Sequence, residues 1–320
     1  MCDVVALTPR ELVPISSCVL LPDRPLGIDV YLIKAIDSKP VLFCSRDQTL
    51  SEAKLDTVAQ RLPGRLYVRC SDADRLQAYI REHWSDILRD DSRPLEDRTR
   101  LMCNVMRDVL ADAFASRNIQ RIAATADFLA AESTRLLQDA PVAIGELSKI
   151  MQHDFATFTH STNVALYSLR LAQELGFSTD EQQCIVRGAL LHDVGKLEIT
   201  ENILSKPDRL TQEELRQIRQ HPTTGLEQLV DQALTFGELM IVYQHHERID
   251  GSGYPVGSVG EEIHPFARLC AITDVYEALT AHRPYRRALR AKAAMHVLQR
   301  KEGVHFDREM LACWKGLVEV

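Results

Sequence analysis

The sequence predicts an α+β protein in which a small N-terminal α/β domain precedes an all-α domain. Short β-rich segments alternate with a helical pattern in the first part of the chain, and a break in hydrophobic periodicity follows near residue 90. Beyond this break, amphipathic helical patterns continue to the end of the chain. The 320 residues also exceed the usual size of one domain, which favours two domains.

The N-terminal domain is predicted to span residues 1–90. Residues 30–33 and 40–43 are rich in β-formers and flank turn residues, a pattern that predicts a hairpin. Residues 51–62 have helical periodicity, and residues 66–68 return to a strand pattern. Because the segment contains no catalytic constellation, we interpret it as a regulatory domain.

Residues 91–142 are expected to form a helical connector. The segment 90–96 interrupts the periodicity, and residues 98–137 are nearly free of Gly and Pro. Apolar side chains such as Met102 and Met106 recur there at helical spacing. Such a stripe is typical of a packed core or a dimer seam, so a homodimer through these helices is an expected assembly.

The C-terminal domain is predicted to span residues 143–320 as a succession of helices. An apolar helical pattern leads up to residues 192–193, and Gly195 is placed to end that helix. Thr211 and Glu214 have the spacing of a capping box, which predicts the start of another helix. The polar side chains of interest therefore lie on or beside rigid helices.

The composition excludes several classes of function. The formal net charge of -7 argues against a nucleic-acid polymer as partner, because such binding needs a basic surface. The eight cysteines are scattered without a C-x-x-C pair, as expected of a reducing compartment. No segment has the apolar length of a signal peptide or a membrane span. We therefore expect a cytoplasmic protein with no membrane partner.

Histidine and aspartate side chains gather in the helical domain in a pattern typical of a metal centre. Isolated polar side chains at the end of an apolar helix would be costly to bury without partners. Imidazole nitrogen and carboxylate oxygen without thiolate fit manganese, iron or zinc, and an aspartate can bridge two ions. The predicted chemistry is hydrolysis by metal-activated water. The candidate ligands are His160, His192, Asp193, His221, His245, His246 and Asp274.

These donors belong to an ordered series of motifs. The series is His192-Asp193-Val194-Gly195-Lys196, His221-Pro222, His245-His246-Glu247, Gly253-Tyr254-Pro255, Asp274, and Arg283-Pro284-Tyr285-Arg286. From about residue 143 onward, the chain closely resembles the HD-GYP family of the HD superfamily. Members of that family are helical, metal-dependent phosphodiesterases that hydrolyse cyclic di-GMP in bacteria. The resemblance implies an HD-type catalytic domain over residues 143–320.

The resemblance also implies two divalent metal ions, with iron and manganese as the expected elements. Asp193 is expected to bridge the two ions, and Asp274 to complete the first metal site. The second metal site is expected to contain three imidazoles, those of His221, His245 and His246.

Ala156 bears on the number of ions. Some members of the family place a glutamate one helical turn before the histidine that matches His160, and they bind a third metal. Ala156 removes that carboxylate from the helix face, and Asp154 points in a different helical direction. We therefore expect two ions rather than three.

Asp193 and Lys196 are the predicted catalytic residues. Lys196 is expected to bind a phosphate oxygen of the substrate or to assist the leaving group. Arg283 and Arg286 carry planar guanidinium groups suited to phosphate, and we expect them to bind the substrate.

The segment Gly253-Tyr254-Pro255 is expected to bind the nucleotide, because glycine lets the backbone approach a ligand and Tyr254 offers a ring for guanine stacking. By its spacing alone the segment would be an ordinary surface turn with a packed tyrosine. Glu277 stands where many members of the family have aspartate, and we expect this longer side chain near the substrate.

The resulting hypothesis is a bacterial phosphodiesterase that converts cyclic di-GMP to pGpG, with GMP as a further product. One alternative keeps this chemistry but changes the substrate to another cyclic dinucleotide, such as a mixed GMP-AMP ring, because fold and motif do not determine the base. The other alternative is a non-catalytic metal-binding adaptor that contacts signalling proteins through the Gly253-Tyr254-Pro255 loop.

Overall fold

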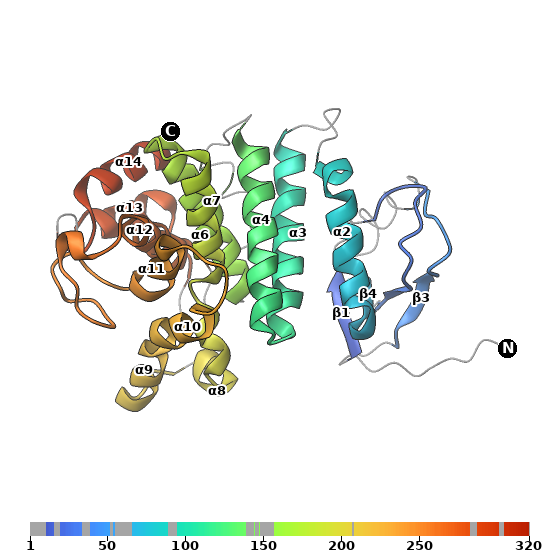
Figure 1. Cartoon of the computed structure of the whole chain (residues 1–320), viewed down its shortest axis with the longest axis horizontal. Coiled ribbons are helices and arrows are strands. Elements are labelled where there is room, and N and C mark those ends of the chain that lie inside the picture. The colour runs from blue at the N-terminus through green and yellow to red at the C-terminus, as the bar shows by residue number, and fades with distance from the viewer. Residues whose placement is uncertain are drawn as a thin grey trace. The chain divides into compact units, whose positions relative to one another are not determined.

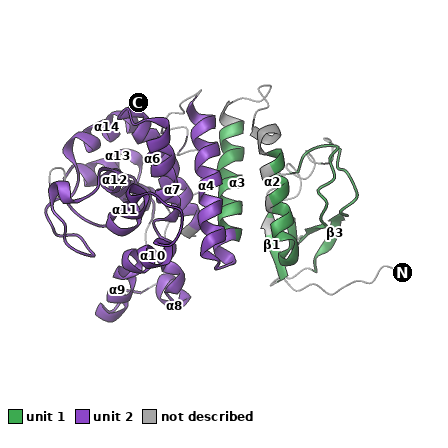
Figure 2. Cartoon of the chain, viewed as in Figure 1, with its two compact units in different colours: residues 1–112 green, residues 113–320 purple. Residues whose placement is uncertain are grey.

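The protein is described by a computed structural model and divides into two compact units, Met1–Asp112 and Ala113–Val320 (Figures 1 and 2). The division falls within helix α3 (Leu95–Ala115), inside the segment expected as a connector. The structure describes residues 11–15, 20–33, 39–51, 54, 66–88, 95–138, 144, 147, 157–206, 208–281, 287–300 and 304–319.

The N-terminal unit contains a four-stranded antiparallel sheet with the order β1-β4-β2-β3. Strands β2 and β3 pair as the predicted hairpin, and β4 confirms the predicted third strand. The periodicity did not reveal β1, which contains Pro14 and lies at an edge of the sheet, where proline is tolerated. The predicted helix 51–62 lies mostly outside the described residues. The strands are β1 (Leu12–Ile15), β2 (Val30–Leu32), β3 (Val41–Cys44) and β4 (Leu66–Arg69).

Helix α2 (Ala73–Leu88) follows β4 through a short 3-10 turn. It is amphipathic and buries Leu76 and Ile80 on its apolar face. On the sheet, Val30 and Val68 are fully buried. The apolar side chains buried on these elements give this unit its own small core.

The second unit is all-α, as predicted. Most of its helices are short to medium in length, and 3-10 turns occur at Val194–Glu198 and Gly260–Glu262. No described helix combines the length and the apolar character that crossing a membrane requires. The helices are α4 (Ile119–Gln138), α6 (Thr157–Glu174), α7 (Thr179–Leu191), α8 (Glu201–Leu204), α9 (Gln212–Arg219), α10 (His221–Leu229), α11 (Phe236–Gln244), α12 (Pro265–Thr280), α13 (Ala291–Gln299) and α14 (Arg308–Val318).

Helix α7 is central to this unit, because it packs against α4, α6 and α11, while α12 packs against α6 and α11. An aromatic cluster joins three of the helices: the Tyr167 ring lies 5.4 Å from that of Tyr276 and 5.6 Å from that of Trp314. All three rings are buried and meet edge to face, a favourable arrangement for aromatic pairs. The cluster holds α6, α12 and α14 in fixed relation.

The predicted capping box at Thr211 is confirmed, because its hydroxyl accepts a hydrogen bond from the backbone N–H of Glu214 at the start of α9. The expectation that Gly195 ends α7 was wrong. That helix ends at Leu191, and Gly195 lies in the following 3-10 turn with a negative φ. A Cβ at Gly195 would lie 2.1 Å from the backbone oxygen of His221, so glycine is required there by the close approach of α10.

Candidate metal centre

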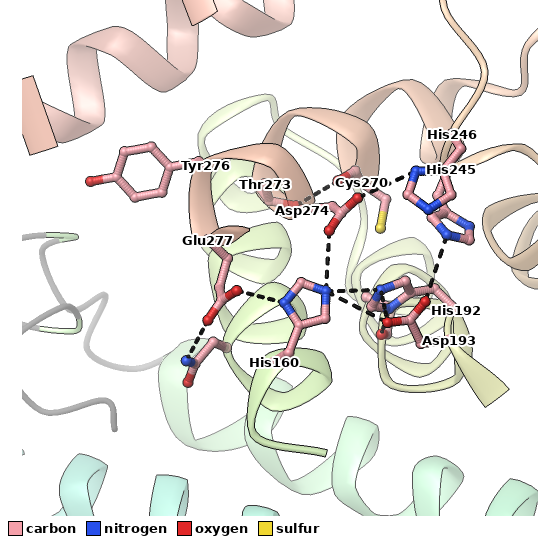
Figure 3. A network of polar contacts seen from close by, with 12 residues as sticks. His160, His192, Asp193, His245, His246, Cys270, Thr273, Asp274, Tyr276 and Glu277 are labelled. Carbon is pink, nitrogen blue, oxygen red and sulfur yellow. Dashed lines mark hydrogen bonds and ion pairs between the residues drawn. The ribbon is translucent and has the colours of Figure 1, made fainter. Parts of the chain in front are cut away.

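The seven predicted metal ligands lie in one place, although they come from five helices or the residues directly after them. Figure 3 labels all of them except His221. His160 is on α6, residues 192–193 follow α7, and His221 begins α10. Residues 245–246 follow α11, and Asp274 is in the middle of α12. Except for His246, which is half-buried, all of these side chains are buried.

The first group of donors comprises His160, His192 and Asp274. Nε2 of His160 lies 3.1 Å from Oδ1 of Asp274 and 3.3 Å from Nε2 of His192. One ligand atom from each residue lies within 4.8 Å of the others, a spacing that a single metal ion can span.

The second group comprises His221, His245 and His246, again with ligand atoms within 4.8 Å of one another. Nε2 of His221 lies 3.1 Å from Nε2 of His245. Nδ1 of His246 faces Oδ2 of Asp274 at 3.8 Å, so this carboxylate reaches toward both groups.

Asp193 lies between the two groups of donors. Its Oδ2 is 3.4 Å from Nε2 of His192, and its Oδ1 is 3.3 Å from Nε2 of His221. The side chain is buried, and Oδ1 accepts no hydrogen bond from the described residues. A buried carboxylate oxygen without a donor is costly unless a cation satisfies it.

Three of the imidazoles have their orientation set by the backbone. In each ring, Nδ1–H donates to the backbone carbonyl three residues earlier in the chain, which leaves Nε2 with a free lone pair in the neutral ring. Two such lone pairs facing each other repel, and a metal ion between them removes the repulsion. The Nδ1 to oxygen distances are 2.7 Å for His192 to Ala189, 2.7 Å for His221 to Ile218 and 3.0 Å for His245 to Val242.

For the three imidazoles of the second group and for Asp193, the electrostatics favour the protonation states that metal binding needs. Burial lowers the pKa of His221 to about 4 and the pKa values of His245 and His246 well below their usual range, so these rings are neutral. Burial opposes ionisation of Asp193, but the Lys196 ammonium and the neighbouring imidazoles outweigh it and hold the carboxyl pKa well below its usual value. Neutral imidazoles and an ionised carboxylate are ligands ready to bind a cation.

His160 has an acidic neighbour on each side. Burial favours its neutral form, yet the carboxylates of Glu277 and Asp274 outweigh this and raise the pKa of the imidazole to about 10. Nδ1 of His160 lies 2.5 Å from Oε2 of Glu277, and Oε1 of Glu277 accepts a hydrogen bond from Asn163 at 3.0 Å. Figure 3 shows Glu277 and Asp274 extending from the same helix toward His160.

This geometry differs from the substrate-binding role that we expected for Glu277. The side chain is fully buried behind His160, one helical turn from Asp274, and it faces the ring nitrogen that points away from the other donors. The carboxylate therefore orients the imidazole of His160, one of the predicted ligands. Because it depends on a contact between α6 and α12, no local pattern in the sequence could reveal it.

Lys196 lies beside the central carboxylate. Its Nζ donates a hydrogen bond of 2.6 Å to Oδ2 of Asp193, while the lysine side chain remains half-buried. The ammonium group is thus held beside Asp193 while part of the lysine side chain is exposed. Arg283 and Arg286, the other expected cations, lie outside the described residues, as does Ala156.

Tyr254 also lies at the donor cluster, but its ring has neighbours. It packs against the ring of His246, with centroids 4.7 Å apart and an interplanar angle of 33°. The Cζ atom of Arg219 lies 5.3 Å from the centre of the same ring. The ring that we expected to stack on guanine is therefore largely engaged within the protein.

The loop that carries Tyr254 is fixed by a residue that the sequence analysis did not assign. Glu247 is buried, and its Oε1 accepts hydrogen bonds from the backbone N–H groups of Val256 at 2.8 Å and Gly257 at 3.0 Å. A Cβ at Gly253 would lie 2.4 Å from the Cα atom of Glu247, so glycine permits this close packing. The acidic residue directly after two ligand histidines was the only signal for this role.

The donor set fits divalent metal ions. Two groups of three donors flank one shared carboxylate, the imidazole lone pairs converge, and no thiolate is among the donors. This arrangement of nitrogen and oxygen ligands suits iron, manganese or zinc.

Comparison with known proteins agrees with this site. The sequence profile described as HD domain matches residues 104–310, which is more than half of the chain. The chain belongs to the HD domain family. The series of motifs that predicted the HD-GYP type lies within the matched residues.

Several curated proteins are similar to this chain. The cyclic di-GMP phosphodiesterase response regulator RpfG of Xanthomonas campestris is 42% identical over 139 residues, which cover 43% of this chain and 37% of RpfG. The cyclic di-GMP phosphodiesterase PA4108 of Pseudomonas aeruginosa is 34% identical over 56% of this chain and 44% of its own length. The 3′3′-cGAMP-specific phosphodiesterase 1 of Vibrio cholerae is 39% identical over 45% of this chain and 33% of its own length. The chain thus spans less than half the length of each of these relatives.

Among solved structures, the HD-GYP-type protein Bd1817 of Bdellovibrio bacteriovorus matches 97% of this chain and 100% of its own chain, with a TM-score of 0.71. Its sequence is 20% identical, so the match concerns the fold. The likeness extends over the N-terminal unit as well as the HD domain.

Proposed function

We propose that this HD domain is a metal-dependent phosphodiesterase that hydrolyses cyclic di-GMP to pGpG, with GMP as a further product. The proposal rests on one observation above all: two groups of donors flank the buried Asp193, which has an oxygen directed toward each group. Such an arrangement holds two cations close enough to act on one phosphate.

His160, His192 and Asp274 would hold one ion, His221, His245 and His246 the other, and Asp193 would be shared by both. When bound, the two ions supply an activated water and neutralise the charge of the phosphodiester. The protein supplies neutral imidazoles in fixed tautomers, and Glu277 holds the ring of His160 in place.

Lys196 has the position of a catalytic residue in this proposal. Its ammonium group lies at the edge of the donor cluster and already binds an oxygen of Asp193. A phosphate oxygen placed over the donors would be within reach of the same group, so the lysine would stabilise charge that develops during hydrolysis. Because the lysine side chain is flexible, its ammonium group can turn toward the phosphate oxygen without movement of a helix.

The base of the substrate is a second question. The similar proteins of known activity include phosphodiesterases named for cyclic di-GMP and others named for 3′3′-cGAMP, at comparable identities of 42% and 39%. We propose cyclic di-GMP as the substrate and 3′3′-cGAMP as the second candidate. The half-buried loop around Tyr254 and the side chains near it would distinguish between the bases.

The test is a side-by-side measurement of hydrolysis by the purified full chain, loaded with Mn²⁺ or with Fe²⁺, on cyclic di-GMP, 3′3′-cGAMP and cyclic di-AMP. Products are identified by chromatography and mass spectrometry. Asp193→Ala serves as the inactive control, because it removes the shared carboxylate. Absence of cleavage of any of these compounds under both metals would disprove the proposal.

We further propose two roles for the rest of the chain. Residues 1–90 would act as a regulatory domain, joined to the catalytic domain 143–320 by the helical connector 91–142. The loop around Gly253-Tyr254-Pro255 would contact signalling proteins, since Val256 and Val259 next to it are 65% and 47% exposed. An Asp193→Ala variant that still signals in cells would separate this contact from catalysis.

A further inference from the structure

The guanidinium group of Arg219 lies at the edge of the metal centre. Arg219 is the last residue of α9, and helix α10 begins two residues later with the ligand histidine His221. Its Cζ atom is 5.3 Å from the centre of the Tyr254 ring, whose centre is 4.7 Å from that of His246. The Tyr254 ring therefore lies next to both the guanidinium group of Arg219 and the imidazole of His246.

The hydrogen-bond donors of Arg219 are available for a ligand. The side chain is exposed, and no carboxylate of the described residues lies within ion-pair distance of it. Two other cations near the donors differ in this respect. Lys196 donates to Asp193, and Arg248 donates to a backbone oxygen and packs over the Phe306 ring at 5.3 Å.

The contact with Tyr254 restrains the guanidinium plane without using its N–H groups. A cation over an aromatic face is attracted by the ring, and the five N–H donors at the edge of the plane stay free. A planar group held in this manner loses less conformational entropy when it binds an anion, and its geometry matches two oxygens of a phosphate. Tyr254 would thus position a cation as well as pack against a ligand histidine.

A cyclic dinucleotide needs such a cation. It carries two phosphodiester groups on opposite sides of a small ring, and the metal centre can take only the one that is cut. The other negative charge must lie outside the metal centre, in a chain with a net charge of -7. Building on the function proposed above, we infer that Arg219 is a substrate-binding residue that binds the second, uncut phosphate of the cyclic dinucleotide.

Binding is measured with the metal-loaded full chain and a phosphorothioate analogue of cyclic di-GMP that resists hydrolysis. Arg219→Ala is expected to weaken the affinity by about 10-fold to 100-fold, as loss of a charge-assisted hydrogen bond does. Arg219→Lys keeps the positive charge but loses the planar fork of N–H donors. Its affinity for the analogue should lie between those of Arg219→Ala and the wild type. Arg216→Ala is the matched control, because Arg216 lies one turn earlier on α9, is exposed and pairs with Glu213. Its affinity should equal that of the wild type.

A second substrate separates phosphate binding from a structural role. Bis(p-nitrophenyl) phosphate contains one phosphodiester and has no second phosphate for Arg219 to bind. Arg219→Ala should raise KM for the cyclic dinucleotide while kcat/KM for the small ester stays at the wild-type value. Equal losses on both substrates, or unchanged affinity for the analogue, would overturn the inference. A wild-type protein that binds the analogue but cuts neither compound would disprove the proposed activity, and the binding comparison would still decide the role of Arg219.

Discussion

Oε2 of Glu277 lies 2.5 Å from Nδ1 of His160, and both side chains are buried between α6 and α12. The contact fixes which nitrogen of His160 faces Asp274 and the other donors, at a Nε2 to Oδ1 distance of 3.1 Å. A carboxylate behind a ligand histidine sets the tautomer and orientation of the ring and increases its basicity. Glu277 is therefore part of the metal centre without facing the metal side of it.

Glu277→Gln should weaken metal binding at the first group of donors by about 10-fold to 100-fold, the usual effect of losing such a partner. Metal content after dialysis against a graded chelator measures this. Glu277→Asp is the informative companion, because a shorter carboxylate retains the charge but loses the contact. If the Gln variant retained both ions as tightly as the wild type, the orienting role would be wrong.

Lys196→Ala should reduce kcat by about 100-fold or more, the usual scale for an acid or base that acts on the reacting groups. The metal content should not change, because Nζ is a hydrogen-bond donor to Asp193 and not a ligand. Lys206→Ala is the control, since Lys206 pairs with Glu214 away from the donors. Loss of metal together with activity would instead indicate that Lys196 maintains the structure of the site.

Gly195→Ala should lower the free energy of unfolding by about 1 to 3 kcal/mol, because an added methyl group overpacks a contact that has no space. The new Cβ would lie 2.1 Å from the backbone oxygen of His221 and 2.7 Å from the backbone nitrogen of Gly225. Urea unfolding of the metal-free protein measures the change.

Gly316→Ala provides the comparison for this substitution, since Gly316 lies within α14 and a Cβ there would meet nothing within 4 Å. This variant should be as stable as the wild type or slightly more stable. A Gly195→Ala protein with wild-type stability would show that α10 can move away at little cost.

Adding Mn²⁺ to the metal-free protein should raise its Tm, because ions that bind only the folded state stabilise it by mass action. At a free concentration 100-fold above Kd, the gain is about 2.7 kcal/mol per site. Asp193→Asn should lose most of the shift, whereas His296→Ala, an exposed histidine on α13, should keep it. An equal shift in all three proteins would mean that Mn²⁺ binds elsewhere.

Local patterns in the sequence were enough for much of this protein. The hairpin of β2 and β3, the helical C-terminal part and the start of α9 at Thr211 all follow from interactions between residues close in the chain. The donor types were equally readable, because His192 and Asp193 stand together at the end of an apolar helix. Together with the other motifs of the series, their chemistry predicts a metal site.

Other features depend on contacts between segments far apart in the chain. In the sequence, Gly195 suggests the end of a helix, but it is the close approach of α10 that requires glycine at this position. Glu277 reads as a substrate contact until α12 packs against α6 and places it behind His160. Arg219 has no local signal, since its neighbour Tyr254 is 35 residues away in the chain.

The sequence by itself thus determined the α+β class and the kinds of ligand, because periodicity, capping and residue chemistry are local properties, and its motifs carried the resemblance to a family. Only the tertiary structure decided which side of Asp193 each histidine occupies, which carboxylate orients His160 and which arginine stands over Tyr254. The physical reason is that these distances result from the packing of five separate helices. A change in the crossing angle between any two of these helices would alter the distances while leaving every local sequence pattern intact.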